Sequence, residues 1–507
     1  MTKYLYGASI QGIQSFIFQT NKLREIMGAS DLVDQLSNSF FIKFLKENNI
    51  VFKEENLILS AAGNIKYEFD TKEECQIFVR RFPKAVMIQA PGIHVSQAVE
   101  RLDDPNQYGK ALQNLEDKLR VQRNKMSYVL GDYTPFKIGE TARRTGGLGF
   151  QYHKDEVLDL GQQKKRKQAE SGESKLSEIL TGKKSYQLPR DNTDLAIEWG
   201  NFTSKNNWLA IIHADGNGLG EVILSIYDKI KGPKLKEVIR EFSKTLDIAT
   251  KSAVKEAYSQ IFEKEAKTEF YEPPIRPILI GGDDITLILK GDAAIPFVQI
   301  FLDKFEQITQ KLFAELEITL QIQSENLELS KGLTACAGVC FVKPNFPFHY
   351  GVHLSDSLTT ESKKHSKANK IEGKIPSSVL FHKVQSSYVD DYSSIADQTL
   401  NHGHIRFDNG PYFTNSIEGF STLEELQSWI KSITRPSAPR SSLRQWLGVV
   451  THDPNQAAFM LERIRQNLNE RGNSKLISEL KLENDYLIKR NGETYTHLYD
   501  TVNLSTI

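Results

Sequence analysis

Three aspartates in the middle of the chain have the spacing of a metal-dependent phosphoryl-transfer site. Asp215 directly follows an apolar segment, and residues 216–220 (Gly-Asn-Gly-Leu-Gly) allow a tight turn into a helix whose free N–H groups suit phosphate oxygens. Asp283 and Asp284 end a Gly-Gly-Asp-Asp turn between two apolar runs. If these segments are neighbouring strands, the three carboxylates converge. Mg²⁺ or Mn²⁺ held there would activate a ribose hydroxyl and stabilise a leaving pyrophosphate.

Other phosphate and metal sites do not fit these residues. An EF-hand starting at Asp215 would need acids at its third and fifth positions and Glu at its twelfth, where the chain has Asn217, Leu219 and Ile226. A dinucleotide fingerprint has no acid at its head, and the sequence has no G-x-x-x-x-G-K-[ST] loop. A Gly-Gly-Asp-Asp turn alone is ordinary hairpin chemistry, so it is the joint pattern that favours a functional site.

The segments that carry the aspartates have the periodicity of a β-α-β-β-α-β unit. The expected elements are strands over 208–214, 277–280, 285–289 and 333–342 and helices over 235–261 and 293–316. In such a unit the hairpin lies beside the first strand. The fold would therefore bring the three acids together.

The N-terminal part of the chain repeats the same order without the acids. The expected elements are strands over 3–9, 57–60, 65–69 and 85–90, with a helical stripe over 23–44. Residues 61–64 (Ala-Ala-Gly-Asn) stand where the second copy has Gly-Gly-Asp-Asp. This difference indicates a duplication in which one copy lost its site.

The sequence thus predicts an α+β protein with four regions. They are a degenerate first unit over 1–139, a polar connector with some helix over 140–200, a second unit with the acids over 201–385, and a mainly helical C-terminal domain over 386–507. A KKRK run at 164–167 is typical of a solvated surface, with RNA or partner contact as the alternative. Ser421 and Glu424 have the spacing of a capping box that would open a C-terminal helix.

Composition sets the limits of this interpretation. The 507 residues include 64 Lys plus Arg and 64 Asp plus Glu, so any polyanion site must be local. Three cysteines are too few for a disulfide framework or a cysteine-rich zinc site, and they fit a reducing compartment. The chain has no apolar run of membrane-spanning length and no signal-peptide pattern. We expect a cytoplasmic protein without a membrane partner.

The order of motifs resembles the palm domains of polymerases and GGDEF-type nucleotide cyclases. The duplicated arrangement is similar to the large polymerase-cyclase subunit of type III CRISPR effector complexes, of the Cmr type, and the resemblance covers most of the chain. It rests on GASIQGIQSFIFQTNKLREIMGASDLVDQL, which looks like a degenerate first palm, on LIGGDDITLIL as the catalytic hairpin, and on SLTTESKKHSKANKIEGKIPSSVLF (357–381) after the second palm. The implied fold is two ferredoxin-like palms with a connector and a helical C-terminal domain.

The resemblance implies synthesis of cyclic oligoadenylate from ATP, in a complex with other subunits, guide RNA and target RNA. Matched residue by residue, it assigns Asp215, Asp283 and Asp284 to catalysis and to Mg²⁺ or Mn²⁺ binding. The implied nucleotide-binding residues are Gly216, Asn217, Gly218, Gly220, Gly281, Gly282, Lys363, Lys364 and Lys367. Lys363 and Lys367 are four residues apart and share a helix face, although a solvated surface helix explains the lysines equally well.

The sequence departs from that family in three respects. It begins at the first palm, without the HD nuclease domain that often precedes it, so we do not expect DNA cleavage by an HD site; the only His-Asp pair is His452-Asp453. The connector lacks cysteines for the usual zinc site and must be held in another way. Asn217 stands where a second acid often occurs, which leaves Asp215 alone on its strand, with a backbone carbonyl as a candidate further ligand.

Two further functions stay open at this stage. The chain could be a stand-alone palm cyclase, or a catalytically silent scaffold subunit; retention of all three acids argues against the scaffold. Cys336 and Cys340 are expected to be buried apolar residues. Four histidines are expected to be ordinary loop residues: His349, His353, His402 and His404.

Overall fold

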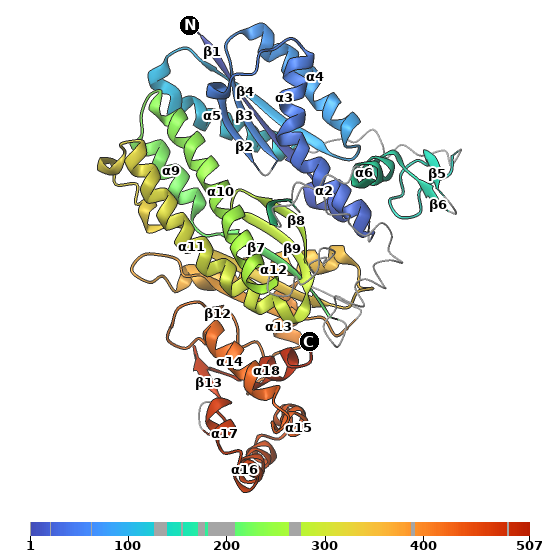
Figure 1. Ribbon diagram of the computed structural model, residues 1–507, viewed down its shortest axis with the longest axis vertical. Helices are drawn as coiled ribbons and strands as arrows, with labels where there is room; N and C mark the ends of the chain where they lie inside the picture. The colour runs from blue at the N-terminus through green and yellow to red at the C-terminus, as the bar shows by residue number, and fades with distance from the viewer. Residues whose placement is uncertain are drawn as a thin grey trace.

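The computed structural model contains two palm-like sheets, one above the other in Figure 1, with the C-terminal region below them. The structure describes residues 2–20, 22–61, 63–125, 139–153, 156–170, 178–180, 208–262, 275–386, 391–483 and 486–507. No helix within these ranges is both long and apolar enough to cross a membrane. The predicted α+β class with two palms is confirmed.

The first palm is a four-stranded antiparallel sheet of order β2-β3-β1-β4 with its helices packed around it. Its elements are β1 (Lys3–Gln11), α1 (Ile13–Phe18), α2 (Leu23–Ser37), α3 (Ser39–Glu47), β2 (Leu57–Ala61), β3 (Asn64–Phe69), α4 (Lys72–Gln89), β4 (His94–Leu102) and α5 (Tyr108–Arg123). The rings of Phe41, Phe78 and Phe82 lie within contact distance of one another and form part of the core.

The second palm repeats this topology, since its strands β10-β7-β9-β8 have the order that β4-β1-β3-β2 have in the first. Its elements are β7 (Leu209–Gly216), α9 (Leu219–Lys229), α10 (Lys234–Phe262), β8 (Ile275–Gly281), β9 (Asp284–Lys290), α11 (Ala294–Thr319), β10 (Ala335–Val342), α12 (Phe348–Ala368) and β11 (Ser378–Lys383). Helices α10 and α11 pack together, and α12 lies across β7, β10 and β11. The shared strand order agrees with a duplication.

One strand predicted in the first palm is wrong. Residues 85–89 belong to α4 and Ala90 is its C-cap; the buried residues Cys75, Phe78, Phe82 and Val86 of this helix recur at helical spacing. The strand that follows the helix and pairs with β1 is β4. The short apolar run was ambiguous because it lies at the end of the helix, where Met87 and Ile88 are half exposed.

The described part of the connector is held by buried cations. It contains β5 (Gln151–His153), β6 (Glu156–Leu158) and α6 (Leu160–Glu170), and α6 packs against α2. Lys165 is fully buried and donates to the carbonyl of Phe16 at 2.5 Å; Arg166 Nε donates to Glu25 Oε1 at 2.7 Å. The expectation of a solvated KKRK run is therefore wrong for its two central residues. Residues 171–177 and 181–207 lie outside the described part.

The C-terminal region is mainly helical, as predicted, and it also contributes a strand to the second palm. Its elements are α13 (Tyr392–Gln398), β12 (Tyr412–Phe413), α14 (Leu423–Ile433), α15 (Arg440–Val450), α16 (Pro454–Glu470), α17 (Lys475–Glu479), β13 (Ile488–Arg490), β14 (Glu493–Tyr495) and α18 (Leu498–Leu504). The capping box lies one residue later than predicted, at Thr422 and Glu425. Strand β12 pairs with β11, so this region continues the palm sheet.

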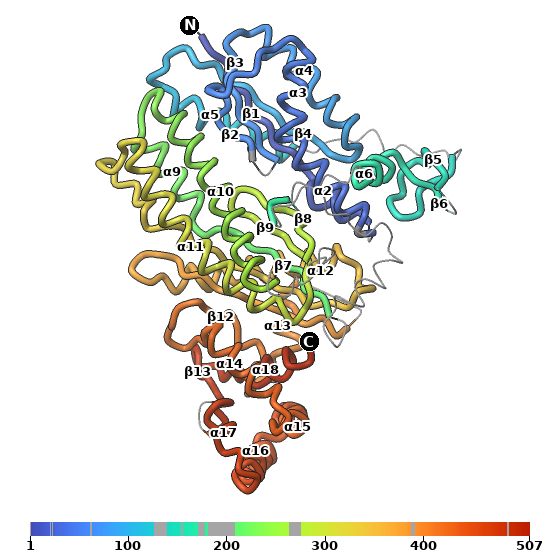
Figure 2. Tube along the Cα trace, viewed as in Figure 1, coloured from blue at the N-terminus to red at the C-terminus, as the bar shows by residue number. Residues whose placement is uncertain are grey.

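The two palms are in direct contact, and Figure 2 shows the first palm, in blue, lying directly above the second palm, in green and yellow. Helix α10 of the second palm packs against β2 of the first, and α2 packs against β8. Among the residues that the structure describes, two salt bridges join the palms: Lys236 reaches the buried Glu68 at 3.2 Å, and Lys244 reaches Glu54 at 2.9 Å. The outer edge of the β8–β9 hairpin is therefore covered by the first palm.

Candidate metal centre

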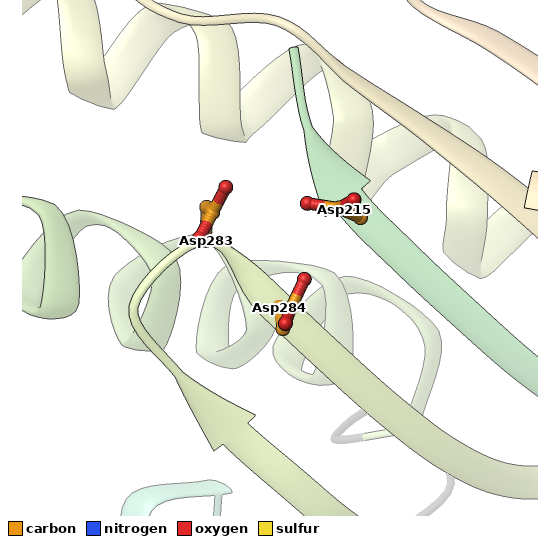
Figure 3. Close-up of side chains that lie close together, drawn as sticks. All are labelled: Asp215, Asp283 and Asp284. Carbon is orange, nitrogen blue, oxygen red and sulfur yellow. The ribbon is translucent and has the colours of Figure 1, made fainter. Parts of the chain in front are cut away.

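The three predicted acids meet at one end of the second palm sheet. Asp215 is the penultimate residue of β7 and Asp284 the first residue of β9, and the antiparallel pairing of Ala214 with Ile285 places the two acids opposite each other. Asp283 lies at the tip of the β8–β9 hairpin. One carboxylate oxygen from each residue lies within 4.8 Å of the others. Figure 3 shows the three side chains pointing into a common space.

Two glycines allow the backbone to bring the three aspartates close together. Gly282 has φ of 63°, a left-handed conformation that glycine adopts without strain and that turns the hairpin. Gly216 lies against Asp283, because a Cβ on Gly216 would lie 2.8 Å from Cβ of Asp283 and 2.9 Å from its Oδ2. The absence of a side chain at Gly216 thus makes room for the second acid.

The electrostatics of the three acids favour a bound cation. Burial and the charge of Asp215 raise the pKa of Asp283, and burial together with the charges of Asp215 and Asp283 raises the pKa of Asp284. Ionising all three carboxyl groups together is costly unless positive charge is supplied. Carboxylate oxygens are the ligands that Mg²⁺ and Mn²⁺ prefer, so the donor set fits the predicted ion.

Lys363 on α12 supplies one positive charge to this group. Its Nζ forms an ion pair with Asp215 Oδ2 and donates to the carbonyl of Gly216 at 2.8 Å. Helix α12 is held in place one turn earlier, where Thr359 Oγ1 donates to the carbonyl of His213 at 3.0 Å. Gly338 of β10 allows this close packing, since a side chain there would overlap the carbonyl oxygen of Ser355.

The other predicted nucleotide-binding residues are spread around the acids. Gly218 is the N-cap of α9 with φ of 72°, and Gly220 lies in the first turn of that helix. The predicted tight turn into a helix is therefore present. Gly281 ends β8. The side chains of Lys364 and Lys367 are exposed on α12, and Lys364 pairs with Glu361 at 3.1 Å. Whether these residues bind nucleotide stays a prediction.

Asn217 does not join the acids. Its side chain is buried and donates to Thr334 Oγ1 at 3.1 Å and to Cys336 Sγ at 3.3 Å, while its backbone N–H donates to the carbonyl of Thr334 at 2.7 Å. Asn217 therefore ties the turn after β7 to the strand below it. These contacts are structural, and the nucleotide contact that the resemblance implied for Asn217 stays a prediction.

Sequence reasoning missed one residue that positions the hairpin. Thr250 of α10 is fully buried, and its hydroxyl donates to the carbonyl of Gly282 at 2.5 Å. The apolar stripe of α10 includes Leu246 and Ala253, so Thr250 lies on the buried face of that helix. A polar residue inside an apolar stripe is the signal that could have identified it.

The remaining candidates agree only in part with their expectations. Cys336 and Cys340 are buried, as predicted, and within the described residues the three aspartates form the one group suited to a metal. His349 and His353 lie on α12 and not in loops, which corrects that expectation. His402 and His404 lie outside helices and strands, as expected.

Comparison with known proteins gives a family for the second palm. Residues 208–372 match the family model described as Cas10/Cmr2, second palm domain. The matched range includes the three aspartates and Lys363. No curated protein matches the sequence.

Comparison with solved structures extends the fold to the whole chain. A chain of the Csm1-Csm4 cassette in complex with one ATP matches with a TM-score of 0.53 and 14% identity, over 99% of this chain and 70% of that one. The cassette in complex with cA3 matches with a TM-score of 0.52 and 13% identity, over 99% and 69%. The Csm1-Csm4 subcomplex of the type III-A CRISPR-Csm interference complex matches with a TM-score of 0.51 and 13% identity, over 100% and 70%.

These identities are low, so the structural matches establish the fold. Together with the family match, they confirm the resemblance to the Cas10-type large subunit of type III CRISPR complexes that the sequence indicated.

Proposed function

We propose that this chain is a metal-dependent nucleotidyltransferase that makes cyclic oligoadenylate from ATP. The observation that carries the proposal is the convergence of Asp215, Asp283 and Asp284 on a palm hairpin, within the segment that matches the Cas10/Cmr2 second palm domain. Further support comes from two solved structures that share the fold, one in complex with cA3 and one in complex with one ATP.

The residues of the site have different roles in the proposed reaction. Asp215, Asp283 and Asp284 would hold Mg²⁺ or Mn²⁺, and Gly216 gives Asp283 the room it needs. When bound, such an ion lowers the pKa of a ribose 3′-hydroxyl and neutralises charge on the leaving pyrophosphate. The turn at the start of α9 offers backbone N–H groups to phosphate oxygens. Lys363, Lys364 and Lys367 would bind the triphosphate from α12.

We further propose that the chain works inside a type III CRISPR complex with guide RNA and target RNA. The support is the fold shared with the Csm1-Csm4 subcomplex of an interference complex. A partner of the Csm4 kind is therefore the first subunit to test. The formal net charge of zero agrees with RNA being held largely by partners.

Product analysis tests this proposal. The purified chain, alone and together with candidate partner subunits, guide RNA and target RNA, is incubated with ATP and Mg²⁺ or Mn²⁺, and the nucleotides are identified by mass spectrometry. We expect oligoadenylate from the wild type and none from the Asp283→Ala/Asp284→Ala variant. Activity of the chain alone would identify a stand-alone cyclase. If the assembled complex makes no nucleotide product, the proposal that the chain is an enzyme fails, and a function as a scaffold subunit is favoured.

A further inference from the structure

The ammonium group of Lys363 lies on oxygen atoms that suit a metal ion. Its two contacts are Asp215 Oδ2 and the carbonyl oxygen of Gly216, which are adjacent on the chain at the end of β7. A carboxylate and a backbone carbonyl are both common ligands of hard divalent cations. An ion that uses Asp215 Oδ2 or the carbonyl of Gly216 therefore needs an oxygen atom that the lysine already engages.

The lysine is also placed so that its head group can leave without disturbing the fold. Its side chain is 19% exposed, whereas the neighbouring serines on α12 are buried. Ser362 shares a 2.6 Å hydrogen bond with Ser378, and Ser366 shares a 2.7 Å hydrogen bond with the same residue. These contacts hold the helix, while four methylene groups let the ammonium group move.

We propose that Lys363 is a tethered competitor of the metal ion, which occupies Asp215 and weakens metal binding by the free chain. The inference rests on the proposed metal-binding role of the three aspartates and goes beyond it. Two positive charges cannot share Asp215 Oδ2 at contact distance without strong repulsion. Metal binding through this oxygen must therefore displace the lysine from Asp215, and whatever gives the ammonium group another anionic partner favours metal binding.

Direct measurement of Mn²⁺ binding tests the competition. Free Mn²⁺ is titrated by electron paramagnetic resonance against the full chain without nucleotide, at one mildly alkaline pH. Lys363→Met, which keeps the length of the side chain and removes the charge, should bind Mn²⁺ roughly tenfold more tightly than the wild type, within the usual range of coupling between two sites. Lys363→Arg keeps the charge and should bind as weakly as the wild type.

Two further variants keep the result interpretable. Lys370→Met removes one exposed positive charge beyond the end of α12 and should leave Mn²⁺ affinity unchanged. Asp283→Asn/Asp284→Asn, made in the Lys363→Met background, should abolish the tight binding. Circular dichroism melting curves confirm that each variant is folded before it is titrated.

The outcomes separate this inference from the proposed function. Equal or weaker Mn²⁺ binding by Lys363→Met, or tighter binding by Lys363→Arg as well, overturns the competition. In that event, loss of Mn²⁺ binding in the Asp283→Asn/Asp284→Asn chain would still support a metal site at the aspartates. If the two asparagine substitutions leave tight binding intact, the ion binds elsewhere and the proposed function loses its metal centre.

Discussion

Gly216 has only a hydrogen atom where other residues have Cβ, and Asp283 lies against that position. A methyl group there would lie 2.8 Å from Cβ of Asp283, closer than carbon atoms approach without a shift. Gly216→Ala should therefore move Asp283 away from Asp215 and lower Mn²⁺ affinity by about tenfold or more, because metal sites require ligands at fixed distances. Titration of Mn²⁺ against the full chain measures the effect.

Gly220→Ala is the matched control for that substitution. A methyl group at Gly220 meets no atom within 4 Å, and Gly220 lies on the helix that follows the same turn. Its Mn²⁺ affinity should equal that of the wild type. Unchanged affinity in Gly216→Ala would show that Asp283 is not a ligand.

The hydroxyl of Thr250 provides a second prediction at the residue scale. Thr250→Val keeps the shape of the side chain and removes the hydrogen bond to the carbonyl of Gly282 at the hairpin tip. We expect the free energy of unfolding in urea to fall by about 1 kcal/mol, the usual net value of a buried hydrogen bond. Thr319→Val should have little effect, since that hydroxyl is exposed and bonds only to Glu315 of its own helix. Equal stability of the Thr250→Val chain and the wild type would contradict the anchoring role.

At the residue scale, the sequence was sufficient to predict that the three acids meet, and it was insufficient to predict the contacts of the residues around them. Asp215 follows an apolar run directly, and Asp283 and Asp284 lie in the turn between two apolar runs, so the positions of the three acids depend on strand pairing. The contact between Lys363 and Asp215 depends on how α12 packs on β10, which is set by a glycine far away in the sequence. The inward orientation of Asn217 depends on Thr334 in the same way.

Among the elements, the buried pair between α2 and α6 explains how the described part of a connector without cysteines is held. The side chain of Glu25 is fully buried and that of Arg166 is 10% exposed. Arg166→Met would leave the carboxylate of Glu25 without its cation, which costs about 3 kcal/mol for buried pairs. We expect faster proteolysis in the connector and a lower urea midpoint.

A double substitution distinguishes this pair from simple packing. Glu25→Leu combined with Arg166→Met removes both charges and should recover much of the lost stability. Lys167→Met, at the exposed neighbouring position on α6, should behave as the wild type. A stable Arg166→Met chain would mean that the pair does not hold the connector.

Long periodic elements were predictable from the sequence, and short or isolated ones were not. The second palm has apolar strands on both sides of its turn and a helix of 29 residues, so its order was readable. The run at 85–90 and the KKRK run were misjudged, because each belongs to a helix whose burial is decided by a partner in another segment.

At the scale of the whole molecule, the C-terminal region is joined to the second palm through a buried carboxyl group. Asp500 of α18 accepts a 2.6 Å hydrogen bond from the hydroxyl of Tyr412, which lies on the strand that extends the palm sheet. Burial raises the pKa of Asp500 to about 8. A sequence shows neither this contact nor the shared sheet, since both depend on how separate regions pack.

The raised pKa predicts how stability depends on pH. From about pH 4 to pH 8 the unfolded chain ionises Asp500 while the folded chain keeps the proton, so this residue lowers stability as pH rises. Asp500→Asn cannot ionise. The free energy of unfolding of this variant, relative to the wild type, should increase by about 5 kcal/mol across that window.

Urea unfolding at several pH values measures this difference. Asp228→Asn, an exposed position on α9, is the control and should follow the wild-type curve. A difference between Asp500→Asn and the wild type that does not change with pH would contradict protonation of Asp500 in the folded chain.

In the proposed reaction, the three aspartates direct attack of a ribose 3′-hydroxyl on the α-phosphate of a second nucleotide. Release of pyrophosphate, measured with ATP and with 3′-deoxy-ATP in the active state of the protein, tests this claim most directly. We predict pyrophosphate release from ATP, loss of that release in Asp283→Ala/Asp284→Ala, and none from 3′-deoxy-ATP. Equal release from both nucleotides would contradict the account, because the 3′-hydroxyl would then not be the attacking group.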